Sequence, residues 1–291
     1  MRDFEYEAPT SLADAVALLE HNNGAAKPLA GGTDLIDHVR CGRLRPELIV
    51  DVKKLPELNV LDVSDEGLRL GAAVPCYRIY EHDQISTKYA ALADSCRIIG
   101  GIQIQNRASV GGNLCNSGPA ADATPSLIAL SAVCVIAGPN GRREIPVEDF
   151  CTGPGKNVLA PGELLVELKL PPVSPRSSSH YRRFIPRNEM DIAVVGVGAS
   201  VVLDESGENF LSARIALGAV AATPLFVEEA SHALAGQPVG DNSIAKAAQA
   251  AQAIAKPIDD MRGTAEFRLH LTGVLTQRVI KAAVERARSR N

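Results

Sequence analysis

The chain has 291 residues, of which 46% are hydrophobic and 22% are charged, and its formal net charge is −4. A chain of this length can bury an extensive core, and the size is typical of about two domains. The weak negative charge, the absence of tryptophan and an aromatic content of 4% argue against a nucleic-acid partner, which needs basic patches and stacking side chains.

Metal sites and membrane segments are not predicted. The six histidines form no HxH or HxxxH pair, and no two cysteines have the CxxC spacing of zinc or iron–sulfur sites. We therefore expect reduced thiols at Cys41, Cys76, Cys96, Cys115, Cys134 and Cys151. The N-terminal MRDFEYEAPTSL has no apolar segment, and no stretch reaches the ~20 apolar residues that cross a bilayer. These features predict a cytoplasmic protein with no membrane span.

Residues 1–55 predict a small α/β unit. Thr10 or Ser11 can cap a helix over LADAVALLE, because a hydroxyl accepts a free N–H of the first turn. KPLAGG then indicates a short strand that runs into a glycine turn, and ELIVDV indicates a second strand. The order of helix, strand, turn, helix and strand is typical of an α/β unit.

Residues 56–173 predict a second unit, of mixed helices and strands. LRLGAAV alternates like a strand, residues 90–98 have helical spacing, and SLIALSA indicates a short helix. Three further strands are predicted over VCVIAG, REIPVEDF and ELLVELKLP, of which the second has the character of an edge strand.

A third unit is predicted after PPVSPRSSS, whose prolines and serines indicate a linker. Three strand candidates follow, YRRF, MDIAVVGVGASVVL and ARIALGAVAA, and then three helices over VEEASHALAG, SIAKAAQAAQAIAK and residues 265–288. The fold class of the whole chain is therefore predicted to be α+β.

Two glycine pairs are the strongest candidates for a ligand site. AGGTDL, residues 30–35, follows a predicted strand, and adjacent glycines expose consecutive N–H groups with no Cβ in the way. Such N–H groups can form an anion-binding concavity, to which Thr33 adds a hydroxyl donor. A tight turn between a strand and a helix would need the same residues, so this motif alone does not distinguish an anion-binding site from a structural turn.

SVGGN, residues 109–113, repeats the arrangement with Ser109 and Asn113 as flanking donors. Two such concavities suit the two phosphates of one dinucleotide better than two coincidental turns. Asp122, nine residues after Asn113, could accept from a ribose hydroxyl or from flavin ring nitrogens. It could equally cap a helix ahead of Thr124.

Two other glycine stretches are predicted to be structural. GVGASV, residues 196–201, has Val201 in place of the third glycine of a dinucleotide fingerprint, and it lies inside a predicted strand. GPGK, residues 153–156, lacks the Ser or Thr that follows the lysine of a P-loop, and it indicates a turn.

Four segments, taken in order, resemble a known family: KPLAGGTDL, IGGIQIQNRASVGGNLCNSGPAADATPSLIAL, GELLVELKLP and RNEMDIA. They are similar to the FAD-binding medium subunit of molybdenum hydroxylases, which include carbon monoxide dehydrogenase and xanthine dehydrogenase. The resemblance covers nearly the whole chain. It implies two FAD-binding subdomains of the vanillyl-alcohol-oxidase (PCMH) type, residues 1–55 and 56–173. A C-terminal α+β domain of the carbon monoxide dehydrogenase flavoprotein type, residues 180–291, would follow.

The resemblance also implies the residues that hold non-covalent FAD. The two glycine motifs would bind its pyrophosphate, Cys115 would lie beside the flavin ring, Leu165 would pack on the cofactor, and Arg183 would supply a basic side chain. Ile99 is a candidate wall of the flavin slot, although a helix-core isoleucine explains it equally well. The full set of predicted contacts is Leu29, Ala30, Gly31, Gly32, Thr33, Asp34, Leu35, Ile99, Ser109, Val110, Gly111, Gly112, Asn113, Cys115, Asp122, Leu165 and Arg183.

The function implied is electron transfer, with no catalytic acid or base on this chain. Electrons would come from a small iron–sulfur subunit and pass to an external acceptor such as NAD, a quinone or oxygen. Molybdopterin and the 2Fe–2S clusters would belong to partner subunits, in a dimer of heterotrimers with a large molybdenum subunit. Two alternatives stay open: a stand-alone flavin oxidase of the vanillyl-alcohol type, and a non-catalytic nucleotide-binding assembly module.

Overall fold

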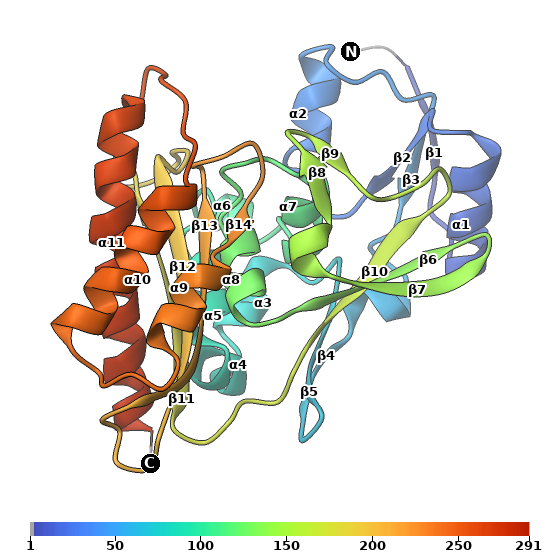
Figure 1. The fold of residues 1–291 in the computed structure, drawn as a ribbon. Coiled ribbons are helices and arrows are strands. Elements are labelled where there is room, and N and C mark those ends of the chain that lie inside the picture. The colour runs from blue at the N-terminus through green and yellow to red at the C-terminus, as the bar shows by residue number, and fades with distance from the viewer. Residues whose placement is uncertain (1–2, 291) are drawn as a thin grey trace.

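In the computed structural model, which describes residues 3–290, three main sheets organise the chain (Figure 1). The first sheet is parallel, with the strand order β1-β3-β2. Ser11 begins the first helix, because its Oγ accepts the N–H of Asp14 at 3.1 Å, which confirms the predicted cap. The elements are β1 (Glu5–Glu7), α1 (Leu12–His21), β2 (Ala26–Leu29), α2 (Leu35–Arg40) and β3 (Leu48–Asp51). Residues 1, 2 and 291 of the predicted domains lie outside the described residues.

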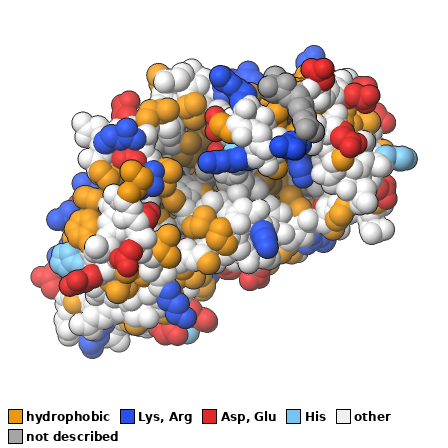
Figure 2. Space-filling view, turned by 90° about the horizontal axis from the view of Figure 1, so that it is seen from above, with side chains coloured by type: hydrophobic (Ala, Val, Ile, Leu, Met, Phe, Trp, Pro, Cys, Tyr) orange, Lys and Arg blue, Asp and Glu red, His pale blue; other side chains and the backbone are white. Residues whose placement is uncertain are grey.

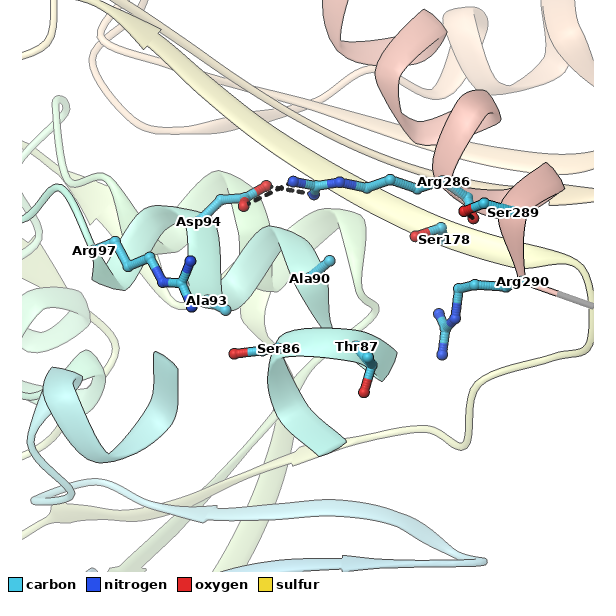
Figure 3. Close-up of a pocket in the computed structure, with 10 residues that line it drawn as sticks. All are labelled: Ser86, Thr87, Ala90, Ala93, Asp94, Arg97, Ser178, Arg286, Ser289 and Arg290. Atoms are coloured by element: carbon cyan, nitrogen blue, oxygen red, sulfur yellow. Dashed lines mark hydrogen bonds and ion pairs between the residues drawn. The ribbon is translucent and has the colours of Figure 1, made fainter. Parts of the chain in front are cut away.

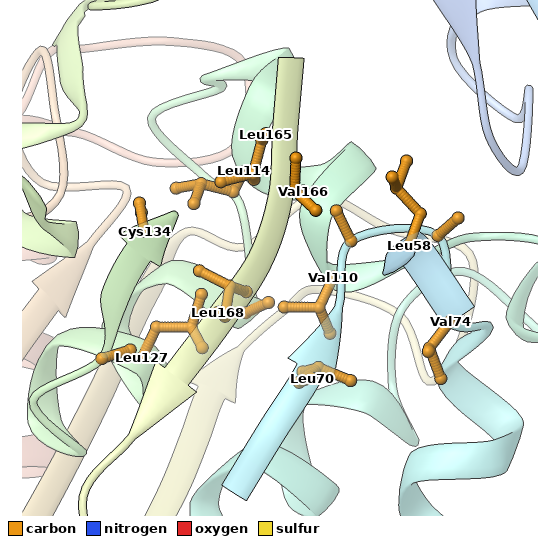
Figure 4. Packing of buried hydrophobic residues seen from close by; sticks show 14 of the residues in the cluster. Leu58, Leu70, Val74, Val110, Leu114, Leu127, Cys134, Leu165, Val166 and Leu168 are labelled. Carbon is orange, nitrogen blue, oxygen red and sulfur yellow. The ribbon is translucent and has the colours of Figure 1, made fainter. Parts of the chain in front are cut away.

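The second sheet is antiparallel, with the order β4-β5-β10-β6-β7, so the predicted edge strand does lie at an edge. Leu70 and Leu168 of this sheet pack against Val110 and Leu114, which belong to the helix α7 (Figure 4). The strands are β4 (Leu61–Ser64), β5 (Gly67–Gly71), β6 (Val133–Gly138), β7 (Gly141–Pro146) and β10 (Leu164–Leu170). Short elements flank them: η1 (Pro56–Asn59), η2 (Val147–Asp149), β8 (Cys151–Gly153) and β9 (Lys156–Asn157).

Six short helices connect β5 to β6. They are α3 (Cys76–Tyr80), α4 (Asp83–Lys88), α5 (Ala90–Cys96), α6 (Ile102–Gln105), α7 (Val110–Asn116) and α8 (Ala123–Ala129). The helix over residues 90–98 was predicted, but α7 was not. The glycine pair of SVGGN therefore lies in the first turn of a helix, which the sequence analysis did not predict. Glycine has a poor helix propensity, so the sequence favours a turn where tertiary packing stabilises a helix.

The third sheet is antiparallel, with the order β11-β12-β13-β14. Helices α10 and α11 lie on its outer side, and α5 and α8 of the preceding unit pack against the sheet as well (Figure 1). The elements are β11 (Ser177–Phe184), β12 (Val195–Leu203), β13 (Phe210–Gly218), β14 (Leu225–Phe226), α9 (Glu228–Leu234), α10 (Asp241–Ile254) and α11 (Ala265–Ser289). None of the helices within residues 3–290 combines the length and the apolarity needed to cross a bilayer.

The predicted linker is shorter than its composition suggested. Ser177, Ser178 and Ser179 are the first residues of β11, and all three are buried. Ser179 Oγ accepts the N–H of Ala91 at 3.0 Å, so this serine is satisfied by α5 rather than by water. A composition rule cannot foresee a partner 88 residues away.

Two glycines of the third sheet allow α8 to approach it. A Cβ on Gly198 would lie 2.6 Å from the carbonyl oxygen of Pro125, and one on Gly218 would lie 2.9 Å from Pro125 Cγ. Gly196 likewise leaves room for a side chain, because a Cβ at this position would lie 2.6 Å from Tyr181 Oη. The structural interpretation of GVGASV is thus confirmed.

We predict that Gly198→Ala destabilises the protein by about 1–3 kcal/mol, because the added methyl group collides with main chain rather than with a movable side chain. Urea denaturation measures the free energy of unfolding. Gly118→Ala is the matched control, since a Cβ there would meet nothing within 4 Å among the described residues. Equal stabilities of the two variants would contradict the packing argument.

Candidate functional site

The two glycine motifs lie against each other. A Cβ on Gly31 would overlap the carbonyl oxygen of Arg107 and lie 3.0 Å from Ala108 Cα. Ala108 immediately precedes Ser109, the cap of α7. The loop after β2 and the start of α7 therefore meet at one place, although about 75 residues separate them in the sequence.

For three of the four glycines, the fold itself explains why no larger residue is present. Gly32 has φ +78°, a Cβ on Gly31 would overlap Arg107, and one on Gly111 would lie 2.5 Å from the carbonyl oxygen of Ala72. Gly112 differs, because within the described chain its Cβ would meet a single atom inside 4 Å, Ser109 Oγ at 3.0 Å. Gly112 is also exposed. Its main chain is thus open to a ligand in a way that a larger residue would obstruct.

The polar groups around α7 are partly used by the protein itself. Ser109 Oγ accepts the N–H of Gly112 at 3.1 Å, and Asn113 Oδ1 accepts the N–H of Ala123 at 3.2 Å. Ser109 is also 98% buried, since its exposed fraction is 2%. Ser109 therefore caps the helix, and its role as a donor to a ligand stays a prediction.

Main-chain N–H groups remain as donors. Val110 and Gly111 occupy the first two positions of α7, and the N–H groups of a first turn have no acceptor within their own helix. Across from them, Ala30, Gly31 and Thr33 are partly exposed. This set is suited to an anionic group that lies between the loop and the helix.

Asp122 and Arg183 form a buried ion pair. Arg183 Nη1 lies 2.5 Å from Asp122 Oδ2, and the two side chains are 4% and 10% exposed. Tyr181 Oη donates to the other carboxylate oxygen at 2.8 Å, and Arg183 Nη2 donates to the carbonyl oxygen of Ile98 at 2.8 Å. Burial raises the pKa of Asp122 to about 6, although Arg183 and Tyr181 both act to lower it.

This network settles one alternative for Asp122. The structure places Asp122 at the N-cap position of α8, but its carboxylate makes no capping bond there, so the capping interpretation was wrong. Its contact with a ligand stays a prediction, since Tyr181 and Arg183 already bind both oxygens. The sequence analysis missed Tyr181. The available signal was strand periodicity, because residues two apart on a strand face the same side.

The predicted apolar contacts lie at different depths. Leu165 is 1% exposed and lies beside Leu114 in the core (Figure 4), and Ile99 is 8% exposed. Both present little surface to a ligand, so their contacts with FAD stay predictions. Cys115 is partly exposed on α7. Burial, and to a smaller extent Cys151, raise the pKa of the Cys115 thiol to about 12, so it is neutral at physiological pH.

The face that carries α2 is hollowed. Figure 2 shows, on the face seen from above, a hollow between the part of the molecule that carries α2 and the part that carries α11. Lys and Arg side chains lie beside this hollow. Such surroundings favour a negatively charged ligand.

Comparison with known proteins identifies the family. A family model described as the FAD binding domain in molybdopterin dehydrogenase matches residues 2–173. The chain belongs to this family. A second model, described as the CO dehydrogenase flavoprotein C-terminal domain, matches residues 179–283 of this molybdopterin dehydrogenase family member.

Relatives span the whole chain. The xanthine dehydrogenase FAD-binding subunit of Escherichia coli O157:H7 is 36% identical over 99% of this chain and 98% of its own. The carbon monoxide dehydrogenase medium chain of Hydrogenophaga pseudoflava is 32% identical over 96% of both chains. In solved structures, carbon monoxide dehydrogenase from Hydrogenophaga pseudoflava aligns with a TM-score of 0.93 at 31% identity, over 98% of both chains. Quinoline 2-oxidoreductase from Pseudomonas putida 86 aligns with a TM-score of 0.90 at 28% identity, also over 98% of both.

These comparisons confirm the predicted family and fold class. They also confirm that the chain is an oxidoreductase subunit with an FAD-binding domain, since both halves match flavoprotein models and the relatives are dehydrogenase subunits. The individual cofactor contacts are not tested by them.

We predict that Arg183→Met lowers the free energy of unfolding by about 3–5 kcal/mol at pH 8, because the buried Asp122 carboxylate, ionised in the wild type, loses its cationic partner and must stay charged without it or take up a proton. Arg182→Met is the control, since Arg182 is exposed on the same strand and its replacement should cost under about 0.5 kcal/mol. Denaturation curves of the two variants give the comparison. A loss of similar size in both would show that the ion pair is not responsible.

Proposed function

We propose that the chain holds FAD non-covalently between the loop at residues 30–34 and the start of α7. We further propose that it transfers electrons from an iron–sulfur subunit to an external acceptor. The observation that supports this proposal is the contact of Gly31 with Arg107, because it brings the first glycine motif next to the residues that precede the second. The relatives named as medium chains and FAD-binding subunits support the same role.

The main chain would bind the pyrophosphate. On α7, the N–H groups of Val110 and Gly111 would donate hydrogen bonds to the phosphate oxygens. In the first motif, the Thr33 hydroxyl and the backbone would bind the same group. Gly112 keeps the approach open, because a Cβ there would occupy exposed space beside Ser109. Leu29, Asp34 and Leu35 flank the loop on β2 and α2, and we propose that they shape its ends.

Asp122 and Arg183 would position the wall of the flavin slot. Arg183 holds the carbonyl group of Ile98, and Ile99 is the next residue. A rigid ion pair inside the protein thus orients the segment at which the ring would lie, without a proton transfer. Cys115 and Leu165 would support the other side through α7 and β10.

The chemistry supplied by bound FAD is the acceptance of single electrons and their release as a pair, which belongs to the cofactor. The residues of this chain bind, orient and shield it, and none is proposed as a catalytic acid or base. We propose a cytoplasmic dimer of heterotrimers with a small iron–sulfur subunit and a large molybdenum subunit, and NAD, a quinone or oxygen as the acceptor. The three main sheets support a division into three units, proposed as residues 1–55, 56–173 and 180–291, although β11 of the third sheet begins at Ser177, before the last of these boundaries.

The purified chain should be yellow and should release FAD, rather than FMN, on denaturation. In Gly112→Val we expect most of the flavin to be lost, because two methyl groups would obstruct the approach of the phosphates to the main chain. Absorbance after gel filtration measures the flavin content. Gly118→Val is the control and should keep its flavin. A colourless wild-type protein would favour the assembly module, and full flavin content in Gly112→Val would refute the assignment of this turn.

A tagged chain expressed in its native host should co-purify with two further polypeptides, one containing iron and sulfur and one containing molybdenum. The mass of the assembly should equal twice the sum of the three chains. We expect the complete assembly, but not the isolated chain, to hydroxylate a substrate. Turnover of an alcohol or amine by the isolated flavin-loaded chain would instead support the stand-alone oxidase.

A further inference from the structure

Most of the exposed large hydrophobic side chains gather in one area. Within residues 3–290, eight such side chains are at least 40% exposed, and six of them belong to three segments. The segments are the start of α6, the loop at residues 187–192, and the loop at residues 258–264 with the first turn of α11. We call these six side chains the apolar rim: Ile102, Met190, Ile192, Ile258, Met261 and Phe267.

Contacts between the segments make the rim continuous. A Cβ on Gly101 would lie 3.3 Å from Met190 Sδ, so Met190 reaches the residue that precedes Ile102. Asp191, the residue after Met190, has its Oδ1 3.7 Å from Arg262 Nε in the loop before α11. Figure 2 shows hydrophobic side chains on the part of the molecule that carries α11, beside the hollow. The rim is therefore one surface and not a set of scattered side chains.

The rim begins at the segment that we propose as a wall of the flavin slot. Arg183 Nη2 donates to the carbonyl oxygen of Ile98 at 2.8 Å, and the chain continues from both residues into the rim. One segment runs through Ile99 to Ile102, and the other runs from Arg183 to Met190. A ligand on the rim would therefore lie beside the proposed flavin wall.

Met190 is held at the surface in a strained conformation. Its φ is +53°, a left-handed value that residues other than glycine rarely adopt, and its side chain is 50% exposed. Arg187 Nη2 donates to the Met190 carbonyl oxygen at 3.0 Å, and Asp191 Oδ1 accepts the N–H of Ile192 at 2.8 Å. Such strain persists only where the surrounding structure imposes it, and it is concentrated at functional sites. The loop therefore presents an apolar side chain to solvent against its local conformational preference.

The charges of the two loops do not favour an anionic ligand. Arg187 and Arg262 are their basic side chains, and both lie next to Asp191, with Nε at 3.3 and 3.7 Å from its carboxylate oxygens. Glu189 is exposed in the same loop as Arg187 and adds a negative charge. NAD carries a pyrophosphate and needs cationic or N–H donors. The rim therefore suits an uncharged, apolar ligand better than a dinucleotide.

A cavity elsewhere in the chain does not offer the same chemistry. It has a volume of about 250 Å³ and is bordered by α4, α5 and the C-terminal end of α11, whereas the rim lies at the start of that helix (Figure 3). Three arginines line the cavity, Arg97, Arg286 and Arg290. Cationic walls do not suit an uncharged, apolar ligand, so the rim is the better candidate.

We propose, on the basis of the flavin site proposed above, that the apolar rim binds a lipophilic quinone and that a quinone, rather than NAD, is the electron acceptor. Exposed apolar clusters mark sites for apolar partners, and methionine side chains adapt their shape to a ligand. Burial of rim side chains against the apolar tail of the quinone supplies the affinity. The quinone takes two electrons and two protons from the reduced flavin and leaves as the quinol, and the flavin returns to its oxidised form.

Isothermal titration calorimetry of the oxidised, flavin-loaded full chain with ubiquinone-1 tests binding without turnover. The wild type should bind, and Met261→Ser and Met190→Asn should each weaken binding about threefold to tenfold, because each removes apolar surface. Asparagine tolerates a positive φ, so Met190→Asn should keep the thermal stability of the wild type while it loses affinity. Leu211→Ser is the matched control, since Leu211 is 60% exposed on β13, outside the rim. It should bind as the wild type does.

Reoxidation of the reduced flavin gives a second readout. In stopped-flow experiments without oxygen, subsaturating ubiquinone-1 should restore the absorbance of oxidised flavin faster than NAD does. Met190→Asn and Met261→Ser should slow this reaction by about the factor by which they weaken binding, and Leu211→Ser should not slow it.

The proposal is overturned if the wild type does not bind ubiquinone-1, if NAD reoxidises the flavin faster, or if Leu211→Ser weakens binding as much as the rim variants do. It is also overturned if the isolated chain binds the quinone and the complete assembly does not, because a partner subunit then covers the rim. A yellow chain that fails these tests leaves the proposed FAD site intact, whereas a colourless chain refutes both proposals.

Discussion

Gly31 and the carbonyl group of Arg107 approach so closely that no side chain fits between them. This contact joins the parallel sheet of the N-terminal unit to the start of α7, and everything proposed for the cofactor depends on it. A diphosphate has two charged groups a few ångströms apart, so its binding motifs must be held at a matching separation. Main-chain groups on packed elements provide that rigidity, whereas long side chains would lose conformational entropy on binding.

The same principle of close backbone approach recurs at the interface with the C-terminal unit. Gly198 and Gly218 let α8 rest on the third sheet, and the Asp122–Arg183 ion pair lies beside this contact. A buried ion pair gains little net stability, because desolvation offsets much of the attraction. Its consequence here is geometric: Arg183 ties the Ile98 carbonyl to β11. The C-terminal unit would therefore help to shape the proposed flavin slot even though the glycine motifs lie elsewhere.

Glycine pairs in a sequence are ambiguous because several physical demands select the same residue. A positive φ selects Gly32, close packing selects Gly31 and Gly111, and exposure beside a capped helix turn distinguishes Gly112. The local pattern indicated that both motifs place unusual demands on the main chain. It could not tell whether positive φ, close packing or exposure to a ligand applies at each glycine. Ser179 at the start of β11 is a similar case, since its polarity suggested a solvated linker while α5 supplies its partner.

The sequence by itself determined the features that depend on neighbours along the chain. The Ser11 cap, the buried strand β10, the edge strand β7 and the long helix α11 follow from local hydrogen bonding and from the periodicity of apolar residues, and the order of four motifs identified the family. Tertiary structure alone decided that SVGGN begins a helix, that Asp122 pairs with Arg183 on another strand, and that Asp191 pairs with Arg262 of another loop. Those outcomes depend on contacts between residues that are distant in the sequence, such as Asp122 and Arg183, 61 positions apart, where packing and desolvation, rather than local propensity, determine the conformation.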